Sequence, residues 1–319
     1  SHPKVDIDKL NKYLNKIKPK LIFLPGWSFE ISKLISNWAK ANRVKIALMS
    51  ETKSDDKRRN IIIEFYKRYF LIPKYSAAIV GGSSHSTYLE SLGMKKELIY
   101  FGYDVVDNDF FKENSYKAKL NKKNILNNFN LENKKFFIGA FRLINRKNTK
   151  RLIESYQIYF NKYGSDSWPL VICGDGCEFE FLNELVNYLK LEKKVIFLGF
   201  VDYLAVSQLY GIASCLVHPA INEQWGLVIN EACAAGLPLI ISDKVGASEE
   251  LLEDGINGFK FDPKSNYQIS NSFIKIHNLS NKDLKKMGLK SVEKVEKLRP
   301  VEFGKSVLKI IQKVLKNEK

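Results

Sequence analysis

The sequence predicts an α/β protein made of two doubly wound domains, each with a parallel sheet. Short apolar runs alternate with segments of helical period along almost the whole chain. Several of these runs end directly on glycine or on a polar turn, which is the order of strand, loop and helix in parallel sheets. With 319 residues, 45% of them hydrophobic, the chain is long enough for two such domains.

The first half is expected to form one domain over residues 1–113. Pro19 ends an amphipathic helix, because proline lacks the amide hydrogen that a helix interior needs. The segment 58–71 has the helical period, with Ile61 and Phe65 on its apolar face. The expected elements are helix 5–18, strand 20–24, helix 29–41, strand 44–49, helix 58–71, strand 77–80, helix 84–92 and strand 98–101.

The stretch 105–135 is rich in Asn and Lys and has little apolar periodicity. We place the domain boundary in it, near residue 113, so that the second domain covers 114–299. Pro300 then interrupts the chain before a last amphipathic helix. The expected elements are strand 136–140, helix 147–163, strand 169–173, helix 178–190, strand 195–198, helix 203–213, strand 215–217, helix 227–235, strand 239–242, a helical region 266–297 and helix 301–316.

The loop after strand 215–217 carries the strongest chemical signal. Gly226 precedes a predicted helix, and the amides of Gly226 and Leu227 would point out of its N-terminus, a position that binds phosphate. Glu223 precedes this turn and Glu231 lies inside the helix; both carboxylates can accept hydrogen bonds from sugar hydroxyls. The alternative for Glu231 is an ordinary solvated helix glutamate.

Two cations flank the turn after strand 136–140. Arg142 and Lys147 at the carboxyl end of a strand suit a diphosphate, although surface cations without a role are the alternative. The backbone around Val201, just after strand 195–198, is placed to meet a flat base.

The first domain offers two weaker candidates. Glu51 follows strand 44–49 and faces either an acceptor or solvent. His85 follows Gly81-Gly82 and lies either in the interdomain cleft or in a structural position at the start of a helix. His218, next to Pro219, is interpreted as structural.

The chain is strongly basic, with a net charge of +16. This favours an anionic partner, either nucleotide phosphates or an anionic membrane surface, over the alternative of a basic surface that binds nothing. The basic residues are dispersed and form no arginine-rich arm, so nucleic acid is not expected. The four cysteines have no usual zinc spacing and indicate buried free thiols in a reducing compartment. No apolar run reaches the roughly 20 residues that span a bilayer, so we expect a cytoplasmic protein, peripheral at the inner face of the membrane.

The ordered motifs resemble those of the retaining glycosyltransferases of family 4, which have the GT-B fold. In the second half these motifs are F-R-L-I-N-R-K-N, V-I-C-G-D-G-C, V-I-F-L-G-F-V, E-Q-W-G-L-V-I-N-E, A-A-G-L-P and K-V-G-A-S-E-E-L-L-E-D-G-I-N-G-F. In the first half P-G-W-S, M-S-E-T and V-G-G-S-S-H look like one bacterial branch of the family. The resemblance implies two Rossmann-like domains facing a cleft, with residues 300–319 packing back on the first domain.

The resemblance also implies roles for individual residues. Arg142 and Lys147 would hold the donor diphosphate, assisted by the amides of Gly226 and Leu227. Glu231 would bind the ribose hydroxyls of the nucleotide. The remaining implied donor contacts are Glu223 to the sugar near the reacting carbon, the Val201 backbone to the base, and Glu250 close to the nucleotide; Glu51 and His85 stay on the acceptor side.

The function implied is transfer of a hexose, with retention, from a nucleotide sugar to a glycan or lipid-linked acceptor of the cell envelope. No cofactor or metal is expected, because the two cations take the charge of the diphosphate. Two alternatives remain: a nucleotide-sugar-binding scaffold without activity, and a GT-B nucleotide-sugar epimerase. A glycosidase-like use of Glu223 and Glu231 leaves the phosphate features without purpose.

The chain departs from the family pattern at its start. Only about 20 residues precede the P-G-W-S strand, where family members have a glycine-rich loop and further strand–helix units. The first domain is therefore expected to be shortened, either because the sequence is part of a longer protein or because the parent protein has a reduced acceptor domain. This bears on activity more than on the donor site.

Overall fold

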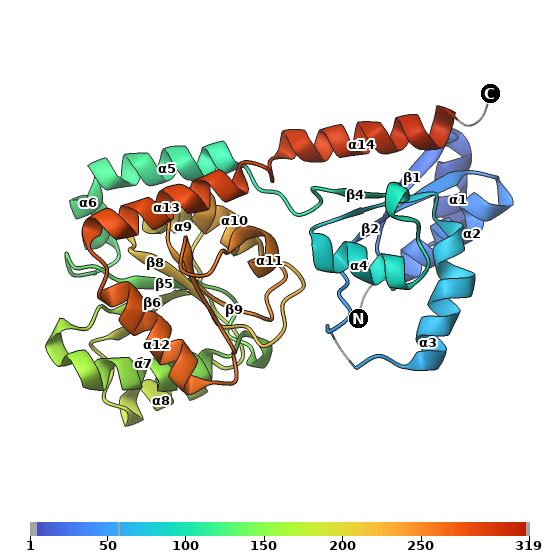
Figure 1. Cartoon of the computed structure of the whole chain (residues 1–319). Helices are drawn as coiled ribbons and strands as arrows, with labels where there is room; N and C mark the ends of the chain where they lie inside the picture. The colour runs from blue at the N-terminus through green and yellow to red at the C-terminus, as the bar shows by residue number, and fades with distance from the viewer. Residues whose placement is uncertain (1–4, 57, 317–319) are drawn as a thin grey trace. The chain divides into compact units, whose positions relative to one another are not determined.

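The computed structural model describes residues 5–56 and 58–316, and the chain divides into two compact units (Figure 1). The first unit runs to Val105 and includes the residues from Pro300 onward, and the second unit is Val106–Arg299. The boundary expected near residue 113 is corrected, because that residue lies inside the helix α5 (Asn108–Leu120). Each unit is a parallel α/β structure with its own apolar core.

The described elements of the first unit are α1 (Ile7–Ile17), β1 (Leu21–Pro25), α2 (Glu30–Ala41), β2 (Lys45–Ser50), α3 (Ile61–Tyr66), β3 (Ala77–Val80), α4 (Ser83–Ser91), β4 (Ile99–Phe101) and α14 (Pro300–Leu315), besides short π and 3-10 turns. The strands pair in parallel in the order β1-β2-β3-β4. Ala39 of α2 and Leu89 of α4 belong to the core on one face of this sheet. Ile310 and Val314 of α14 are buried against the other face, so this C-terminal helix completes the first unit (Figure 1).

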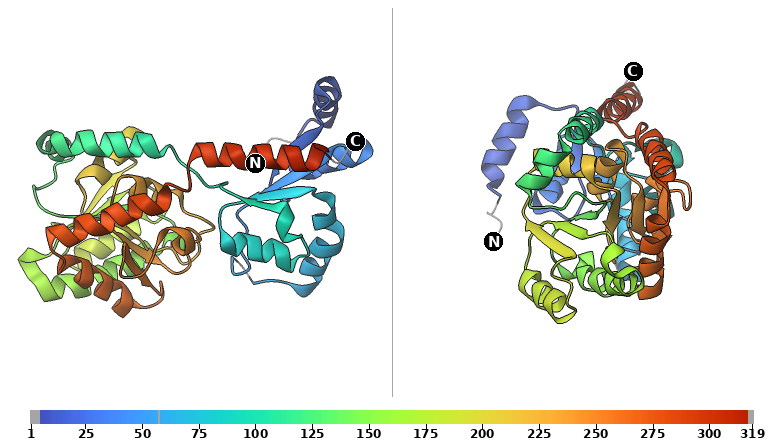
Figure 2. Two further views of the ribbon diagram at one scale, coloured as in Figure 1. Left: turned by 45° about the horizontal axis from the view of Figure 1, so that its top comes forward. Right: turned by 90° about the vertical axis from the view of Figure 1, so that its left-hand side faces the viewer.

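The described elements of the second unit are α5 (Asn108–Leu120), α6 (Lys122–Asn128), β5 (Phe137–Ala140), α7 (Thr149–Tyr163), β6 (Leu170–Cys173), α8 (Phe179–Tyr188), β7 (Val195–Gly199), α9 (Tyr203–Ile212), β8 (Cys215–His218), α10 (Leu227–Ala234), β9 (Leu239–Ser242), α11 (Ser248–Leu251), β10 (Gly258–Phe261), α12 (Asn266–His277) and α13 (Asn281–Val295). The helices α5, α9 and α10 cover one face of the sheet, and α7, α8 and α12 cover the other (Figures 1 and 2). Successive residues of β5 show this layering, because Phe137 packs in one apolar cluster and Ile138 in the opposite one.

The structure adds elements to the second unit that the sequence did not predict. The stretch 105–135 forms α5 and α6, and the Ser115 hydroxyl donates a hydrogen bond to the Ser207 carbonyl at 3.1 Å. Gly211 permits this close packing of α5 on α9, since a Cβ there would collide with the Ser115 backbone. Residues 258–261 form the edge strand β10, and the helical region 266–297 is two helices that break before the N-cap Ser280.

The segment 58–71 also differs from its prediction. Its helix α3 begins after Asn60, whose side chain accepts hydrogen bonds from two amides of the first turn, and continues as a π-helical turn over Lys67–Leu71. Its apolar face is exposed instead of packed on the domain. Cys177 is likewise exposed, whereas the other three cysteines are buried as expected. None of the described helices combines the length and the apolar character that crossing a membrane would require.

Candidate functional site

The strand order of the second unit defines where a ligand should bind. Its sheet runs β10-β9-β8-β5-β6-β7, so the chain moves outward from β5 on one side and returns to β8 on the other. Open α/β sheets bind ligands beyond the carboxyl ends of the strands at such a reversal. The loops that leave β5 and β8 here are 141–148 and 219–226, and both contain residues that the sequence singled out.

These two loops meet at Glu223. The Lys147 ammonium donates a hydrogen bond to Glu223 Oε2, and Arg146 Nη1 lies 3.5 Å from Oε1. The His218 Nε2 atom lies 3.7 Å from Oε2. Arg142 is exposed on the same turn as Lys147. One carboxylate therefore faces two cations from the neighbouring loop, and with Arg142 on the same turn the excess of positive charge suits an anionic group.

The protonation states follow from burial and from these contacts. Burial works to raise the pKa of Glu223, but the neighbouring His218 and Lys147 outweigh it and lower that pKa to about 2. Burial lowers the pKa of His218, so its ring is neutral near pH 7 beside the ionised Glu223. Burial also lowers the pKa of Lys147, against the opposing effect of Glu223.

His218 is fully buried, yet neither ring nitrogen has a hydrogen-bond partner among the described residues. Its ring packs edge-on against Phe141, with centroids 5.5 Å apart. A buried donor or acceptor without a partner is costly unless a ligand satisfies it. His218 therefore belongs to the candidate site, next to Glu223.

The backbone of the Glu223 loop is held by the segment after β9. The Gly246 amide donates to the Glu223 carbonyl at 3.1 Å, and the Ala247 amide donates to the Trp225 carbonyl at 3.0 Å. A side chain at Gly246 would collide with the Gln224 carbonyl, so this approach requires glycine. The loop is thus fixed before any ligand arrives.

Helix α10 places two further predicted elements at this site. Gly226 has a φ of +100° and precedes the first helical residue, Leu227, so that the free amides of the first turn open beside Glu223. Glu231 is half-buried one turn further and accepts a hydrogen bond from the Tyr210 hydroxyl at 3.2 Å. Burial raises the pKa of Glu231 to about 7, although the Tyr210 hydrogen bond acts in the opposite direction.

Backbone hydrogen bonds connect the chain at the carboxyl ends of the neighbouring strands β5, β6 and β7. The Leu143 amide donates to the Asp175 carbonyl at 2.9 Å, and the Gly174 amide donates to the Gly199 carbonyl at 2.7 Å. Val201 follows β7 and packs, partly buried, on the core cluster that contains Ile229. Glu250 is half-buried on α11, in the segment that continues from Gly246.

The two acceptor-side candidates lie in the first unit. Glu51 follows β2 directly and is hydrogen-bonded to the buried Asp104, whose pKa is raised by burial and by Glu51. His85 is fully buried, and its Nδ1 accepts a hydrogen bond from the Gly82 amide at 3.0 Å at the start of α4. That environment fits the structural alternative for His85.

A cavity of about 860 Å³ lies away from this site. It is lined by Tyr116 of α5, by Ala213 and Pro238, and by Leu284 of α13. Ala213 and Pro238 precede β8 and β9, so the cavity opens at the amino-terminal edge of the sheet, away from the loops described above. Among the described residues no group of three His, Cys, Asp or Glu side chains is arranged to hold a metal ion.

Sequence reasoning did not single out Arg146 or Tyr210, and it interpreted His218 as purely structural. The spelling R-K at 146–147 could have indicated a second cation beside Lys147. Tyr210 gives no such signal, because its link to Glu231 depends on how α9 packs beside α10. The structure brings together Arg142, Lys147, Glu223, Gly226, Leu227 and Glu231 within one unit.

A parallel α/β unit with clustered cations, a helix N-terminus and buried carboxyls at a strand reversal is typical of proteins that bind nucleotides. The family model for group 1 glycosyl transferases matches residues 121–291, more than half of the chain. The chain therefore belongs to this family, and its two Rossmann-like units are those of the GT-B fold.

Similarities to individual proteins agree with this assignment. The chain is 31% identical over 171 residues to an uncharacterized glycosyltransferase, MJ1607, of Methanocaldococcus jannaschii, covering 54% of this chain and 42% of that protein. It is 28% identical to the N-acetyl-alpha-D-glucosaminyl L-malate synthase of Bacillus anthracis, covering 55% and 45%. The matched region is thus less than half the length of these relatives.

Solved structures share the fold over nearly the whole chain. A glycosyltransferase from Rickettsia africae superposes with a TM-score of 0.80 at 17% identity, covering 100% of this chain and 84% of that one. Anabaena Alr3699/HepE in complex with UDP gives a TM-score of 0.74 at 19% identity, covering 98% and 81%. At these identities the likeness concerns the fold alone.

Proposed function

We propose that this protein is a retaining glycosyltransferase that moves a hexose from a UDP- or GDP-linked sugar to a glycan or lipid-linked acceptor in cell-envelope polysaccharide or glycolipid synthesis. The observation that carries the proposal is the meeting of Lys147, Glu223 and the start of α10 at the strand reversal. The complexes of Alr3699/HepE with UDP and of the pneumococcal O-GlcNAc transferase with UDP and GlcNAc support a nucleotide-sugar donor.

The donor would lie across the two loops. Arg142, Arg146 and Lys147 supply positive charge for the diphosphate, and the amides of Gly226 and Leu227 add donors from the helix N-terminus. Glu231 would accept hydrogen bonds from the ribose hydroxyls, while the backbone at Val201 faces the base and Glu250 lies near the nucleotide. Glu223 and the buried ring of His218 would contact hydroxyls of the sugar.

Transfer then requires the cations above all. As the bond between the anomeric carbon and the diphosphate oxygen breaks, the electron pair leaves with the diphosphate, and the cations stabilise the developing charge. The acceptor oxygen forms its bond to the same face of the anomeric carbon, and its proton passes to the departing phosphate oxygen. The cations perform the role that a metal would have, so we propose a metal-independent reaction. Glu51 and His85 remain candidates on the acceptor side.

A thermal-shift panel with UDP, GDP, ADP and their common sugars tests the donor site. A ligand at about 100 times its dissociation constant stabilises by roughly 2.7 kcal/mol, which shifts the melting temperature of a protein of this size by a few degrees. The proposal expects one nucleotide family to give this shift and its labelled sugar to be transferred or slowly hydrolysed. Binding without either reaction would favour a scaffold protein, and an altered sugar nucleotide without acceptor would favour an epimerase.

A further inference from the structure

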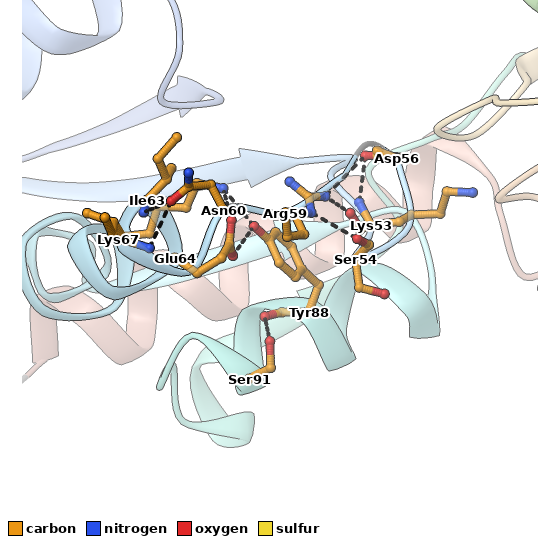
Figure 3. A network of polar contacts seen from close by, with 11 residues as sticks. Lys53, Ser54, Asp56, Arg59, Asn60, Ile63, Glu64, Lys67, Tyr88 and Ser91 are labelled. Carbon is orange, nitrogen blue, oxygen red and sulfur yellow. Dashed lines mark hydrogen bonds and ion pairs between the residues drawn. The ribbon is translucent and has the colours of Figure 1, made fainter.

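In the segment 60–71 of the first unit, charged side chains face the domain and large apolar side chains face solvent. Lys67 is buried, and its ammonium donates hydrogen bonds to Glu64 Oε1 at 2.7 Å and to the Tyr88 hydroxyl at 2.8 Å. The Tyr88 hydroxyl in turn donates to Glu64 Oε2 at 2.7 Å (Figure 3). Surface helices normally bury apolar residues and expose charged ones. Here the polar residues attach the segment to the domain.

The network that holds the segment extends to its start. The Arg59 guanidinium lies over the Tyr88 ring, 4.5 Å from its centroid, and the Asn60 side chain accepts from the Ile62 amide at 2.9 Å (Figure 3). Burial opposes the ionisation of Glu64, but its contacts with Lys67 and Tyr88 prevail and lower its pKa. The orientation is therefore fixed by specific contacts on the inner face.

The outer face is apolar and aromatic. Seven of its large side chains are each more than half exposed, with values from 53% for Tyr66 to 87% for Ile61: Ile61, Ile62, Ile63, Phe65, Tyr66, Tyr69 and Phe70. Single exposed apolar residues are ordinary, but a contiguous group of this kind marks an interaction surface. Aliphatic residues combined with Tyr and Phe are typical of helices that lie in the interface of a bilayer.

The charge of the segment indicates the partner. Residues 58–74 contain five cations, Arg58, Arg59, Lys67, Arg68 and Lys74, and a single acid, Glu64. That acid is paired with Lys67, and Arg59 lies 4.0 Å from Asp56 just before the segment, so among the described residues Arg58, Arg68 and Lys74 are the cations that no acid pairs. An exposed apolar face flanked by unbalanced positive charge complements a membrane surface with anionic headgroups, where each nearby cation adds to the attraction.

We propose that the segment 60–71 attaches the protein to an anionic lipid bilayer by inserting its exposed apolar face into the headgroup region. The inference deepens the proposed function, since it rests on an acceptor made at a membrane. It assigns a particular surface, which the overall positive charge of the chain does not do.

Flotation with lipid vesicles tests this assignment. Wild-type protein should float with vesicles that contain phosphatidylglycerol, should bind pure phosphatidylcholine more weakly, and should lose the difference at high salt. The variant Ile61→Gln/Phe65→Gln/Tyr69→Gln should lower the partition coefficient about a hundredfold, because three apolar side chains no longer leave water. The matched control Leu120→Gln/Tyr188→Gln/Tyr267→Gln alters three side chains of the second unit that are 74–83% exposed, and it should bind as wild type does.

Equal binding by the two triple variants would overturn the assignment, as would wild-type protein that stays off anionic vesicles. Vesicle binding that is absent, together with a dimer that the first variant dissociates, would instead identify a contact between protein chains. The nucleotide thermal shift is measured on every variant in parallel. It should be unchanged, so that failure of the donor site and failure of the membrane surface are distinguished.

Discussion

Glu231 carries a proton that makes the stability of the folded chain depend on pH. Its pKa is about 7 in the folded chain, mainly because burial disfavours the charged form, against an ordinary value of 4.5. The folded state therefore retains a proton that the unfolded chain has released, and this stabilisation is lost as pH rises from 4.5 to about 7. Above that range the ionised carboxylate, held away from water, destabilises the folded state.

Replacing Glu231 with Gln should separate the effect of this carboxyl on stability from its proposed effect on nucleotide binding. Near pH 8 the free energy of unfolding of Glu231→Gln should rise by about 2 kcal/mol, because no buried charge remains. The nucleotide-induced thermal shift should fall at the same time, since the amide replaces an acceptor of both ribose hydroxyls. Chemical denaturation with and without nucleotide measures both quantities. The exposed Glu180→Gln is the control, and a variant that loses stability together with binding would contradict this account.

The affinity of the wild-type protein for a nucleotide should rise with pH, whereas the stability that Glu231 contributes falls with pH. Ribose hydroxyls donate to the ionised carboxylate, so binding should weaken below about pH 7, by up to about tenfold per pH unit. Titration calorimetry with a nucleotide sugar, whose diphosphate does not ionise in this range, measures the dependence. Glu231→Gln should show a flat profile; a slope that persists in this variant would assign the titration to another group.

Lys147 should matter more for turnover than for stability. Lys147→Met removes the cation that is paired with Glu223 and that would face the diphosphate, so we expect the transfer rate to fall by about 10² to 10³. The exposed Lys150→Met, at the start of α7, should leave the rate unchanged. Comparable losses in both variants would mean that general positive charge, and not the contact with Glu223, supports the reaction.

The turn around Gly246, in the segment after β9, holds the loop that contains Glu223. Gly246→Ala would press a methyl group against the Gln224 carbonyl and push the segment after β9 away from the Glu223 loop. We expect a loss of about 1–3 kcal/mol in unfolding free energy and a weaker nucleotide shift. Gly304→Ala in α14, where a Cβ would have no neighbour within 4 Å, should be neutral or slightly stabilising. Thermal unfolding of both variants with nucleotide checks this.

The period of the apolar residues, together with Gly and Pro at the ends of segments, was sufficient to predict most elements, because this period follows directly from which faces are buried. The helices within 105–135 were not predicted, since α5 is held by Ser115 and by Gly211 of α9, a contact that its own sequence does not reveal. Segment 60–71 was predicted as a helix, but not with Lys67 inward, because a helical period does not say which side faces the domain. In the site, the motif spacing indicated Glu223 and Lys147, whereas Tyr210 depends on packing between helices.

The second unit should fold without the first. Residues 106–299 are continuous in sequence, contain two extensive apolar clusters, and include every predicted donor-binding residue. We expect this fragment to unfold cooperatively and to keep the nucleotide shift, while it loses sugar transfer. Calorimetry and the thermal-shift panel on the isolated fragment measure this. A fragment that folds but no longer binds nucleotide would show that the first unit contributes to the donor site.

The reversal of strand order between β5 and β8 has a kinetic consequence. Lys147 and Glu223 are 76 positions apart, and β6, β7, α8 and α9 lie between them in the chain. Contacts of such high sequence separation form only after the intervening chain has been organised. A partly folded or nascent chain would therefore have no donor site at all. A nucleotide sugar would recognise the finished unit alone and slow its unfolding, so abundance of the donor in the cell would lengthen the lifetime of the enzyme.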